Sequence, residues 1–110
     1  MEVVSGDVVT MCRFNILERM VIPAHSHPQE QLAYVINGKM KMRVGNLERT
    51  LGPGDIQIVP GNVEHSAEVL EVPFQEIDVF SPVRQDFLES CPDDSFPSPH
   101  DIELSAFCKT

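Results

Sequence analysis

Short apolar runs separated by turn residues fill the first 80 residues of the chain, and their spacing limits the fold more than any other feature. The runs that favour strands cover residues 8–13, 15–22, 31–36, 39–44, 47–51, 56–59, 66–70 and 74–80. Cations and apolar residues alternate strictly in the run 39–44, which is the period of a half-buried strand. Asn37-Gly38 and Gly45-Asn46 predict tight hairpin turns. Strands about six residues long at about ten-residue spacing predict an all-β sandwich or barrel.

The size and charge of the chain narrow its organisation and its partners. Its 110 residues are enough for one domain and too few for two. Its 17 acidic residues against 8 Lys and Arg give a formal net charge of −9, which would repel nucleic acid. No apolar run approaches the roughly 20 residues of a membrane span, and the first residues lack the basic and apolar segments of a signal peptide. We therefore expect a cytoplasmic protein that binds neither nucleic acid nor membranes.

The sequence changes character after Pro82, which predicts the end of the last strand. Residues 83–89 are expected to form one or two helical turns, and the prolines that follow favour an irregular segment. We predict a barrel domain over residues 1–88 and a tail over residues 89–110. The tail is expected to pack on the barrel or on the partner chain of a homodimer.

Three cysteines occur without the close spacing of a metal site, which favours a protein with reduced thiols. Cys12 is predicted to be a buried thiol. A bridge between Cys91 and Cys108 stays open as an alternative. His100 in the tail is expected to be a surface residue.

Three histidines lie where strands are expected to end. His25 and His27 are two residues apart, so an extended backbone directs both imidazoles to one face. His65 lies close to the start of a later strand and can supply a third imidazole from a facing position. Neutral imidazole is the commonest metal ligand for divalent transition metals. The pattern indicates a candidate metal site, and the alternative is a set of ordinary packing or surface histidines.

Two stretches around these histidines resemble the two motifs of the cupin family. Residues 23–38 resemble the first motif, HxHx3Ex6G, with both spacings kept from His27 to Gln31 and from Gln31 to Gly38. Residues 54–65 resemble the second motif, Gx5PxGx2H, and end at His65. The resemblance implies an all-β fold, the antiparallel double-stranded β-helix or jelly-roll barrel, here with a short C-terminal helix and an irregular tail.

The chain departs from the cupin motifs at three positions. Asn62 stands where the second motif usually has Gly, and Val69 stands where its final Asn would fall. Gln31 replaces the usual Glu of the metal site, while Glu30 is one residue out of register. A shift of one residue on a strand turns a side chain to the other face, so Glu30 is retained only as an alternative ligand.

The resemblance implies that His25, His27, Gln31 and His65 hold one divalent transition metal, which could be Zn, Ni, Fe, Co or Mn. All four ligands are neutral, so the metal keeps its full positive charge and polarises bound oxygen more strongly. The missing carboxylate disfavours the oxygen activation typical of non-haem iron oxygenases. A metal-free cupin with a buried polar cluster is the alternative.

Residues 76–88 resemble the D-x-F-S-P-x-R-x-D-F-L ending of small bacterial cupins of the pectin-degradation type. Those cupins linearise 4,5-unsaturated monouronates, and they too carry Gln in place of the metal-site Glu. The resemblance implies that Asp78, Phe80 and Arg84 are active-site side chains. Asp78 would transfer protons if burial raises its pKa. Arg84 would bind the uronate carboxylate bidentately, and Phe80 would form an apolar wall.

The strand around Asp78 can be oriented in two ways. Asp78 and Phe80 share one face, whereas Ile77 and Val79 share the other. If Ile77 and Val79 face a core, Asp78 lies in solvent. If Asp78 faces the barrel interior, Ile77 and Val79 need a second layer or a partner chain to cover them.

The same ending can also be interpreted as a purely structural terminus. Ser81 would then cap a short helix, and Arg84 would pair with Asp86 or with a main-chain carbonyl. On function, we expect a metal-dependent, isomerase-like enzyme that acts on a small anionic sugar. The alternatives are a cupin that binds a small ligand without catalysis and a metal-dependent dioxygenase.

Overall fold

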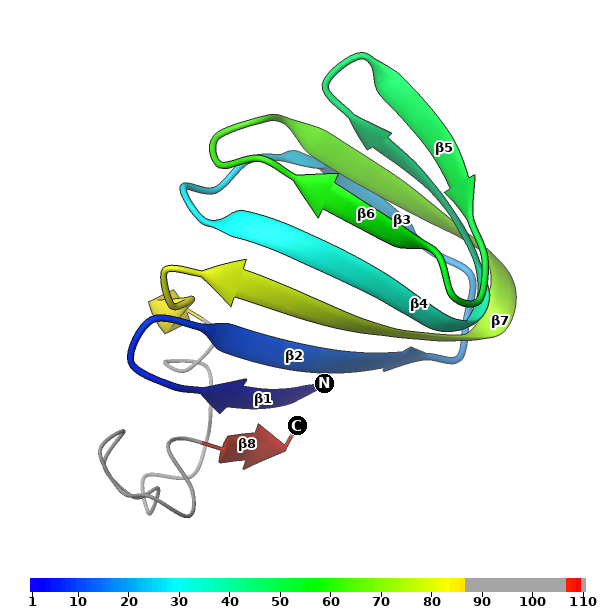
Figure 1. The fold of residues 1–110 in the computed structure, drawn as a ribbon. Helices are drawn as coiled ribbons and strands as arrows, with labels where there is room; N and C mark the ends of the chain where they lie inside the picture. Colours follow the sequence, from blue (N-terminus) through cyan, green and yellow to red (C-terminus); the bar gives the residue numbers. More distant parts are fainter. Residues whose placement is uncertain (87–106, 110) are drawn as a thin grey trace.

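The computed structural model describes residues 1–86 and 107–109, and most of these residues lie in β-strands. The strands are β1 (Glu2–Ser5), β2 (Thr10–Ile16), β3 (Val21–His25), β4 (Glu30–Val44), β5 (Leu47–Leu51), β6 (Ile56–Val59), β7 (His65–Ser81) and β8 (Phe107–Lys109). Every strand pairing in the described residues is antiparallel. The structure therefore confirms the all-β, jelly-roll prediction (Figure 1).

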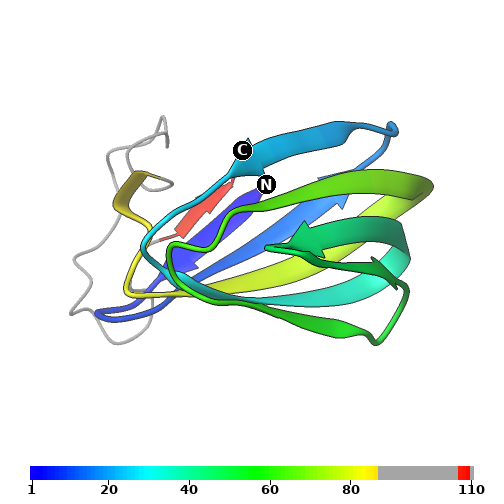
Figure 2. The same ribbon diagram turned by 90° about the horizontal axis from the view of Figure 1, so that it is seen from above.

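Two long strands, β4 and β7, run side by side through the whole sheet and bend halfway along their length. The first half of β4 and the second half of β7 join β6, β2, β1 and β8 in what we call the long layer. The other halves join β5 and β3 in the short layer. Figures 1 and 2 show β7, green to yellow, folding back on itself at the bend.

The bend depends on Gly38, which lies inside β4 and has a φ of +83°. A Cβ at this position would lie 2.6 Å from the carbonyl oxygen of Glu71 and 2.7 Å from that of Pro73. The predicted hairpin at Asn37-Gly38 is therefore wrong, because β4 continues through this pair. The Asn37 side-chain amide donates to the Pro73 carbonyl of β7 at 3.0 Å. This amide therefore bonds to the neighbouring strand, whereas in a hairpin it would bond within the turn.

The apolar core lies between the two layers. Its main cluster comprises Val35, Met40, Met42, Leu51, Val59, Ala67, Val69 and Phe74. The alternation predicted for residues 39–44 is confirmed, with Met40 and Met42 buried and the cations on the other face. Cys12 is buried as a free thiol, as predicted, and burial raises its pKa to about 12.

The end of β7 at Ser81 confirms the predicted stop before Pro82. Gln85 and Asp86 are helical, and the rest of the predicted helix lies outside the described residues. Cys91, its pairing and His100 lie there too. Part of the expected tail forms β8, which pairs with β1, and the division at residue 88 stays a prediction. Within the described part of the chain, no helix has the length and apolar character that a membrane crossing requires.

Candidate metal centre

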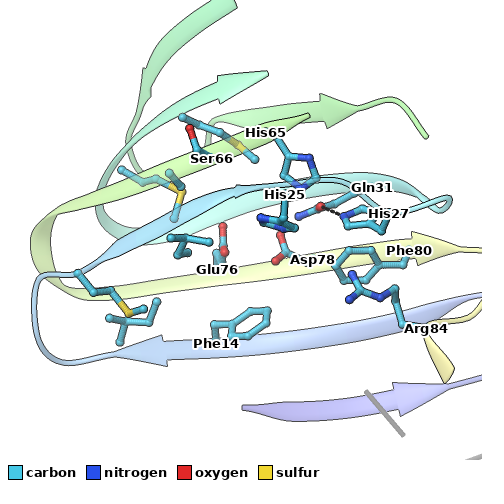
Figure 3. A pocket seen from close by; sticks show the side chains of 16 residues that line it. Phe14, His25, His27, Gln31, His65, Ser66, Glu76, Asp78, Phe80 and Arg84 are labelled. Carbon is cyan, nitrogen blue, oxygen red and sulfur yellow. Dashed lines mark hydrogen bonds between the residues drawn. The ribbon is translucent and has the colours of Figure 1, made fainter. Parts of the chain in front are cut away.

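His25, His27 and His65 come together at one end of the two layers. His25 ends β3 and pairs directly with His65, the first residue of β7. His27 follows in the loop before β4. One ring nitrogen from each histidine lies within 4.8 Å of the others. The group that the sequence predicted is therefore brought together in space (Figure 3).

The three imidazoles are oriented in the same way. Each Nδ1 lies 2.9–3.0 Å from a backbone carbonyl oxygen two residues away in the chain. These carbonyls belong to Pro23, Gln29 and Val63. A carbonyl oxygen only accepts hydrogen bonds, so each Nδ1 carries the proton and each Nε2 presents a lone pair. The hydrogen bond from each Nδ1 therefore fixes the tautomer in which Nε2 is free of a proton and can bind a metal.

Two of these Nε2 atoms, those of His27 and His65, have no hydrogen-bond donor for their lone pairs. His65 Nε2 is buried without a hydrogen-bond partner. His27 Nε2 lies 3.2 Å from Gln31 Oε1, and in this tautomer both atoms are acceptors. A cation between them, or rotation of the Gln31 amide, relieves the repulsion. Three imidazole nitrogens and an amide oxygen suit a divalent transition metal. The side chains present therefore fit the metal that the sequence predicted.

Burial favours the neutral form of the two inner histidines. His27 and His65 are both buried, and desolvation lowers the pKa of each below its usual value. The positive charge of Arg84 lowers the pKa of both rings further. A neutral imidazole does not have to lose a proton before it binds a metal.

Two residues of the turn between β6 and β7 hold the loop of His27. A Cβ on Gly61 would lie 2.5 Å from the carbonyl oxygen of Pro28, so only glycine permits this approach. Asn62 has a φ of +64°, and its N–H donates to the His27 carbonyl at 2.8 Å. Asn tolerates this left-handed conformation better than most residues, which explains how it replaces the motif glycine.

Gln31 and Glu30 lie on opposite sides of β4. Gln31 is buried and lines the cavity beside the histidines. Glu30 is exposed and does not line it. The structure thus directs the amide, and not the neighbouring carboxylate, toward the histidine group.

A cavity of about 410 Å³ extends from the histidines between the two layers. Its polar side chains include Glu76, Asp78 and Arg84, which lie around the histidine group in Figure 3. Its remaining wall is mainly apolar and includes Phe14, Ile16, Met20, Ile22, Met40 and Met42. The cavity thus combines a polar end with an apolar body.

Asp78 faces the interior, which answers the question of orientation that the sequence left open. Only 4% of Asp78 is exposed, and its carboxylate points toward the histidine group (Figure 3). Burial raises the pKa of Asp78 to about 6, although hydrogen bonds with Gln31 and Glu76 and the charge of Arg84 oppose the rise. Its Oδ1 is buried without a hydrogen-bond partner. A carboxyl with this pKa can both accept and donate a proton near neutral pH.

Glu76 is a cavity residue that the sequence reasoning missed. It is buried two residues before Asp78, on the same face of β7. Burial, followed by the charge and the hydrogen bond of Asp78, raises the pKa of Glu76 to about 9. The period-two pattern that joins Asp78 to Phe80 also includes Glu76, so this signal was present in the sequence.

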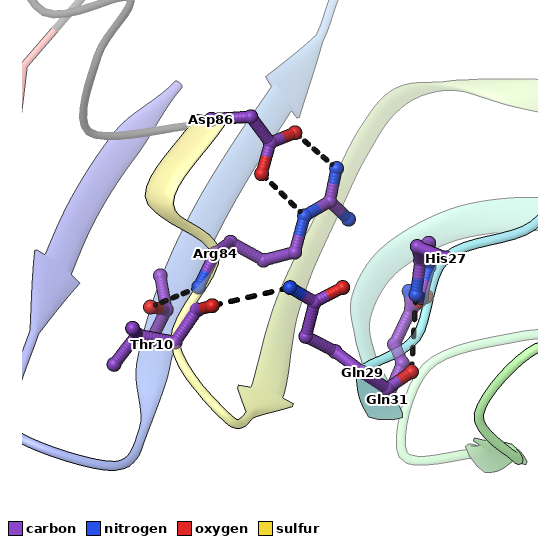
Figure 4. Close-up of polar contacts among 7 residues, drawn as sticks. Thr10, His27, Gln29, Gln31, Arg84 and Asp86 are labelled. Carbon is purple, nitrogen blue, oxygen red and sulfur yellow. Dashed lines mark hydrogen bonds and ion pairs between the residues drawn. The ribbon is translucent and has the colours of Figure 1, made fainter.

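Arg84 lies just beyond β7 and is held by several contacts (Figure 4). Its backbone N–H donates to Thr10 Oγ1 at 2.9 Å. Its guanidinium stands over the Phe80 ring, with Cζ 4.9 Å from the ring centroid, and lines the cavity. Nε and Nη2 donate to the two carboxylate oxygens of Asp86 at 2.9 and 2.6 Å.

The ion pair between Arg84 and Asp86 agrees with the interpretation of this ending as a structural terminus. Arg84 nevertheless also lines the cavity. The Ser81 hydroxyl donates to the Val8 carbonyl at 2.9 Å and does not act as the predicted helix cap. The Gln29 amide donates to the Val83 carbonyl at 3.1 Å, which ties the loop of His27 to the Arg84 segment. This hydrogen bond links the histidine end of the cavity to the Arg84 end.

Known proteins are similar to this chain, in sequence and in structure, over most of its length. Residues 14–78 match the family model of the cupin domain. The pectin degradation protein KdgF of Dickeya dadantii is 32% identical over 85 residues, which is 76% of each chain. The structure of KdgF from Halomonas sp. superposes with a TM-score of 0.73 at 30% identity, covering 78% of this chain and 80% of that one. An RmlC-like cupin from Shewanella frigidimarina gives 0.54 at 29% identity, covering 77% and 86%.

Proposed function

Because the chain belongs to the cupin family, we propose that it is a metal-dependent enzyme that opens the ring of a 4,5-unsaturated uronate. The observation that carries the proposal is a buried carboxyl, Asp78, that lines one cavity together with the histidine group and Arg84. The similarity to two KdgF proteins, one of them named for pectin degradation, supports the choice of substrate.

His25, His27, His65 and Gln31 are the proposed metal ligands, as the donor set and the tautomers of the three rings favour. A divalent ion held there would act as a Lewis acid toward a substrate oxygen. The side chains around this site would supply proton transfer and the positioning of the sugar.

Asp78 is the proposed proton carrier. Opening the ring breaks the bond between the anomeric carbon and the ring oxygen, and it takes the proton from the anomeric hydroxyl. The products of this step are an aldehyde and an enolate, and the enolate becomes a ketone when C4 gains the proton. No atom is gained or lost overall. A carboxyl with a pKa of about 6 can take the first proton and return it to carbon.

Arg84 and Phe80 are proposed to position the sugar. Arginine binds carboxylates in a planar, bidentate geometry, and the Arg84 guanidinium reaches the cavity beside Phe80. Asp86 orients the guanidinium from the side through two hydrogen bonds. The Phe80 ring presents an apolar surface to the unsaturated edge of the substrate.

The test is an assay of metal-quantified protein with 4,5-unsaturated galacturonate, which follows the loss of the enol-ether absorbance. We expect loss above the uncatalysed rate that stops after removal of the metal by chelation, returns when the metal is added back and falls sharply in Arg84→Ala. Folded, metal-loaded protein without turnover would contradict the proposal and favour a cupin that binds a small ligand without catalysis. Turnover that requires oxygen and oxidises the substrate would indicate a dioxygenase, which Gln31 disfavours.

A further inference from the structure

Glu76 lies in the cavity but has no part in the proton transfer assigned to Asp78. It is only 6% exposed, and it lines the cavity together with Asp78. The two side chains occupy successive inward positions of β7, so both point to the interior from one face of the strand (Figure 3). Burial of a carboxyl is costly unless its polar atoms are hydrogen-bonded. Glu76 therefore needs a hydrogen-bond partner inside the cavity.

The surroundings of Glu76 favour a neutral carboxyl. Its register partners are Phe14 on β2 and Val35 on β4, and both are apolar. In the described part of the chain, no lysine or arginine forms an ion pair with it. An ionised Glu76 would be a buried, unpaired charge, whereas a protonated one is neutral and carries one O–H donor. The direction in which burial shifts the pKa of Glu76 agrees with the protonated form.

Asp78 is the acceptor for this O–H. A hydrogen bond joins the two carboxyl groups, and it raises the pKa of Glu76 while it lowers that of Asp78. Opposite shifts of this kind are expected when a protonated Glu76 donates to an ionised Asp78. A hydrogen bond to an ionised acceptor is shorter and stronger than one between neutral groups.

Gln31 supplies a second hydrogen bond to Asp78. A carboxylate only accepts, so the amide nitrogen of Gln31 is the donor, and its Oε1 stays directed toward His27. Oδ1 of Asp78 has no hydrogen-bond partner. One carboxylate is thus bonded to a donor from β4 and a donor from β7, and it keeps one oxygen without a bond.

We propose that Glu76 is a positioning residue for the proton transfer by Asp78. Its O–H holds the Asp78 carboxylate in one orientation, so that the unbonded oxygen is the one that takes the proton of the anomeric hydroxyl and returns it to C4. Glu76 keeps its own proton throughout and acts only through Asp78. The inference rests on the proposed function, because it gives Glu76 a part in the same proton transfer.

The competing role for Glu76 is that of a side chain that only fills space. Glu76→Gln keeps an N–H donor for Asp78, whereas Glu76→Met removes the donor at a similar side-chain size. If Glu76 only filled space, methionine would serve at least as well as glutamine, since it buries no polar atom. Gln57→Met is the matched control, because Gln57 is buried on β6 and does not line the cavity.

Steady-state kinetics with 4,5-unsaturated galacturonate separate the two roles. Glu76→Gln and Gln57→Met should keep most of the wild-type kcat. Glu76→Met should lose roughly tenfold or more in kcat with little change in KM, because a misplaced proton carrier slows the chemical step and leaves sugar binding unchanged. Metal analysis and urea unfolding check that each variant keeps its metal and its fold. A kcat for Glu76→Met equal to that of Glu76→Gln would overturn the proposal.

A second measurement does not depend on turnover. The full chain is loaded with zinc and labelled with carbon-13 at its Glu and Asp carboxyl carbons. The Glu76 and Asp78 signals are those missing from Glu76→Gln and from Asp78→Asn. At neutral pH we expect Glu76 at the chemical shift of a protonated carboxyl, and an Asp78 signal that moves more in Glu76→Met than in Glu76→Gln.

The two measurements distinguish failure of this inference from failure of the proposed function. A wild-type chain without turnover contradicts the proposed function, and the carbon-13 spectrum alone then decides whether Glu76 positions Asp78. An ionised Glu76 would overturn the inference in either case. An Asp78 signal that stays in place in Glu76→Met would overturn it as well.

Discussion

Glu76 and Asp78 face one cavity from successive inward positions of β7, and a hydrogen bond joins their carboxyl groups. Burial and the charge of Asp78 raise the pKa of Glu76 from 4.5 to about 9, so Glu76 keeps its proton at neutral pH. In the unfolded chain the same group ionises near its ordinary pKa. The folded state therefore binds one more proton than the unfolded state between these two pKa values, and the free energy of unfolding falls as the pH rises through this window.

Glu76→Gln should remove most of this pH dependence in the metal-free protein. The variant should be more stable than the wild type at pH 8, and the difference should shrink as the pH falls below 4.5, where the wild-type group is protonated in both states. Urea unfolding at a series of pH values measures it. Glu71→Gln, on the exposed part of the same strand, is the control and should follow the wild-type curve. Parallel curves for Glu76→Gln and the wild type would show that Glu76 is ionised in the folded state.

Asp78→Asn should abolish turnover while leaving metal content unchanged. The amide keeps the size of the side chain but cannot carry a proton between hydroxyl and carbon, a loss of roughly a hundredfold or more in kcat. Steady-state kinetics and elemental analysis of the same preparation test both halves of the prediction. Activity within a few-fold of the wild type would remove Asp78 from the proton-transfer role.

Gln31→Glu should bind metal more tightly and turn over more slowly. A carboxylate ligand lowers the net charge of the site and so its power to polarise a substrate oxygen. We expect kcat to fall at least about tenfold, in line with other changes around metal ligands. An oxygenase would tolerate this substitution or gain from it.

Gln57→Glu is the matched control for Gln31→Glu. Gln57 is also buried on a strand, but its side chain lies against Arg49, whose Nη1 donates to it at 2.9 Å. A carboxylate there has a cationic partner and does not line the cavity. Equal losses of activity in the two variants would mean that the effect is one of folding and not of metal charge.

Gly38→Ala should destabilise the protein by roughly 2–4 kcal/mol, the sum of a left-handed backbone cost and a steric overlap. The overlap is with the carbonyl oxygens of Glu71 and Pro73 at the bend. Gly54→Ala is the control, because Gly54 has a φ of +87° but a methyl group there would meet no atom within 4 Å. The free energy of unfolding of Gly54→Ala should fall only by the cost of the left-handed backbone, about 1 kcal/mol. Equal losses, measured by urea unfolding, would show that the crossing of β4 and β7 tolerates a methyl group.

The sequence predicted the parts of this molecule that depend on local spacing. His25 and His27 share a face because they are two residues apart on an extended backbone, and the motif register placed Gln31 and His65 with them. The turn at Gly45-Asn46 and the strands on either side of it follow from local turn chemistry.

The parts that it missed depend on contacts between distant segments. Asn37-Gly38 has the composition of a hairpin, yet the positive φ of Gly38 is used to bring β4 against the bend of β7. The orientation of Asp78 could not be chosen because Ile77 and Val79 are as apolar as a core face. Both faces of that strand are suited to burial, and only the pairing with β4 and β2 decides which one is inside.

The measurement that tests the central claim most directly is a proton NMR spectrum of 4,5-unsaturated galacturonate incubated in D2O with metal-loaded protein. We predict conversion of the cyclic enol ether to the open-chain keto product, with one deuteron at C4 and a rate well above that of the protein-free control. Metal-stripped protein should give the control rate. A spectrum in which the cyclic substrate disappears no faster with metal-loaded protein than without it would contradict the assignment of this cavity to uronate ring opening.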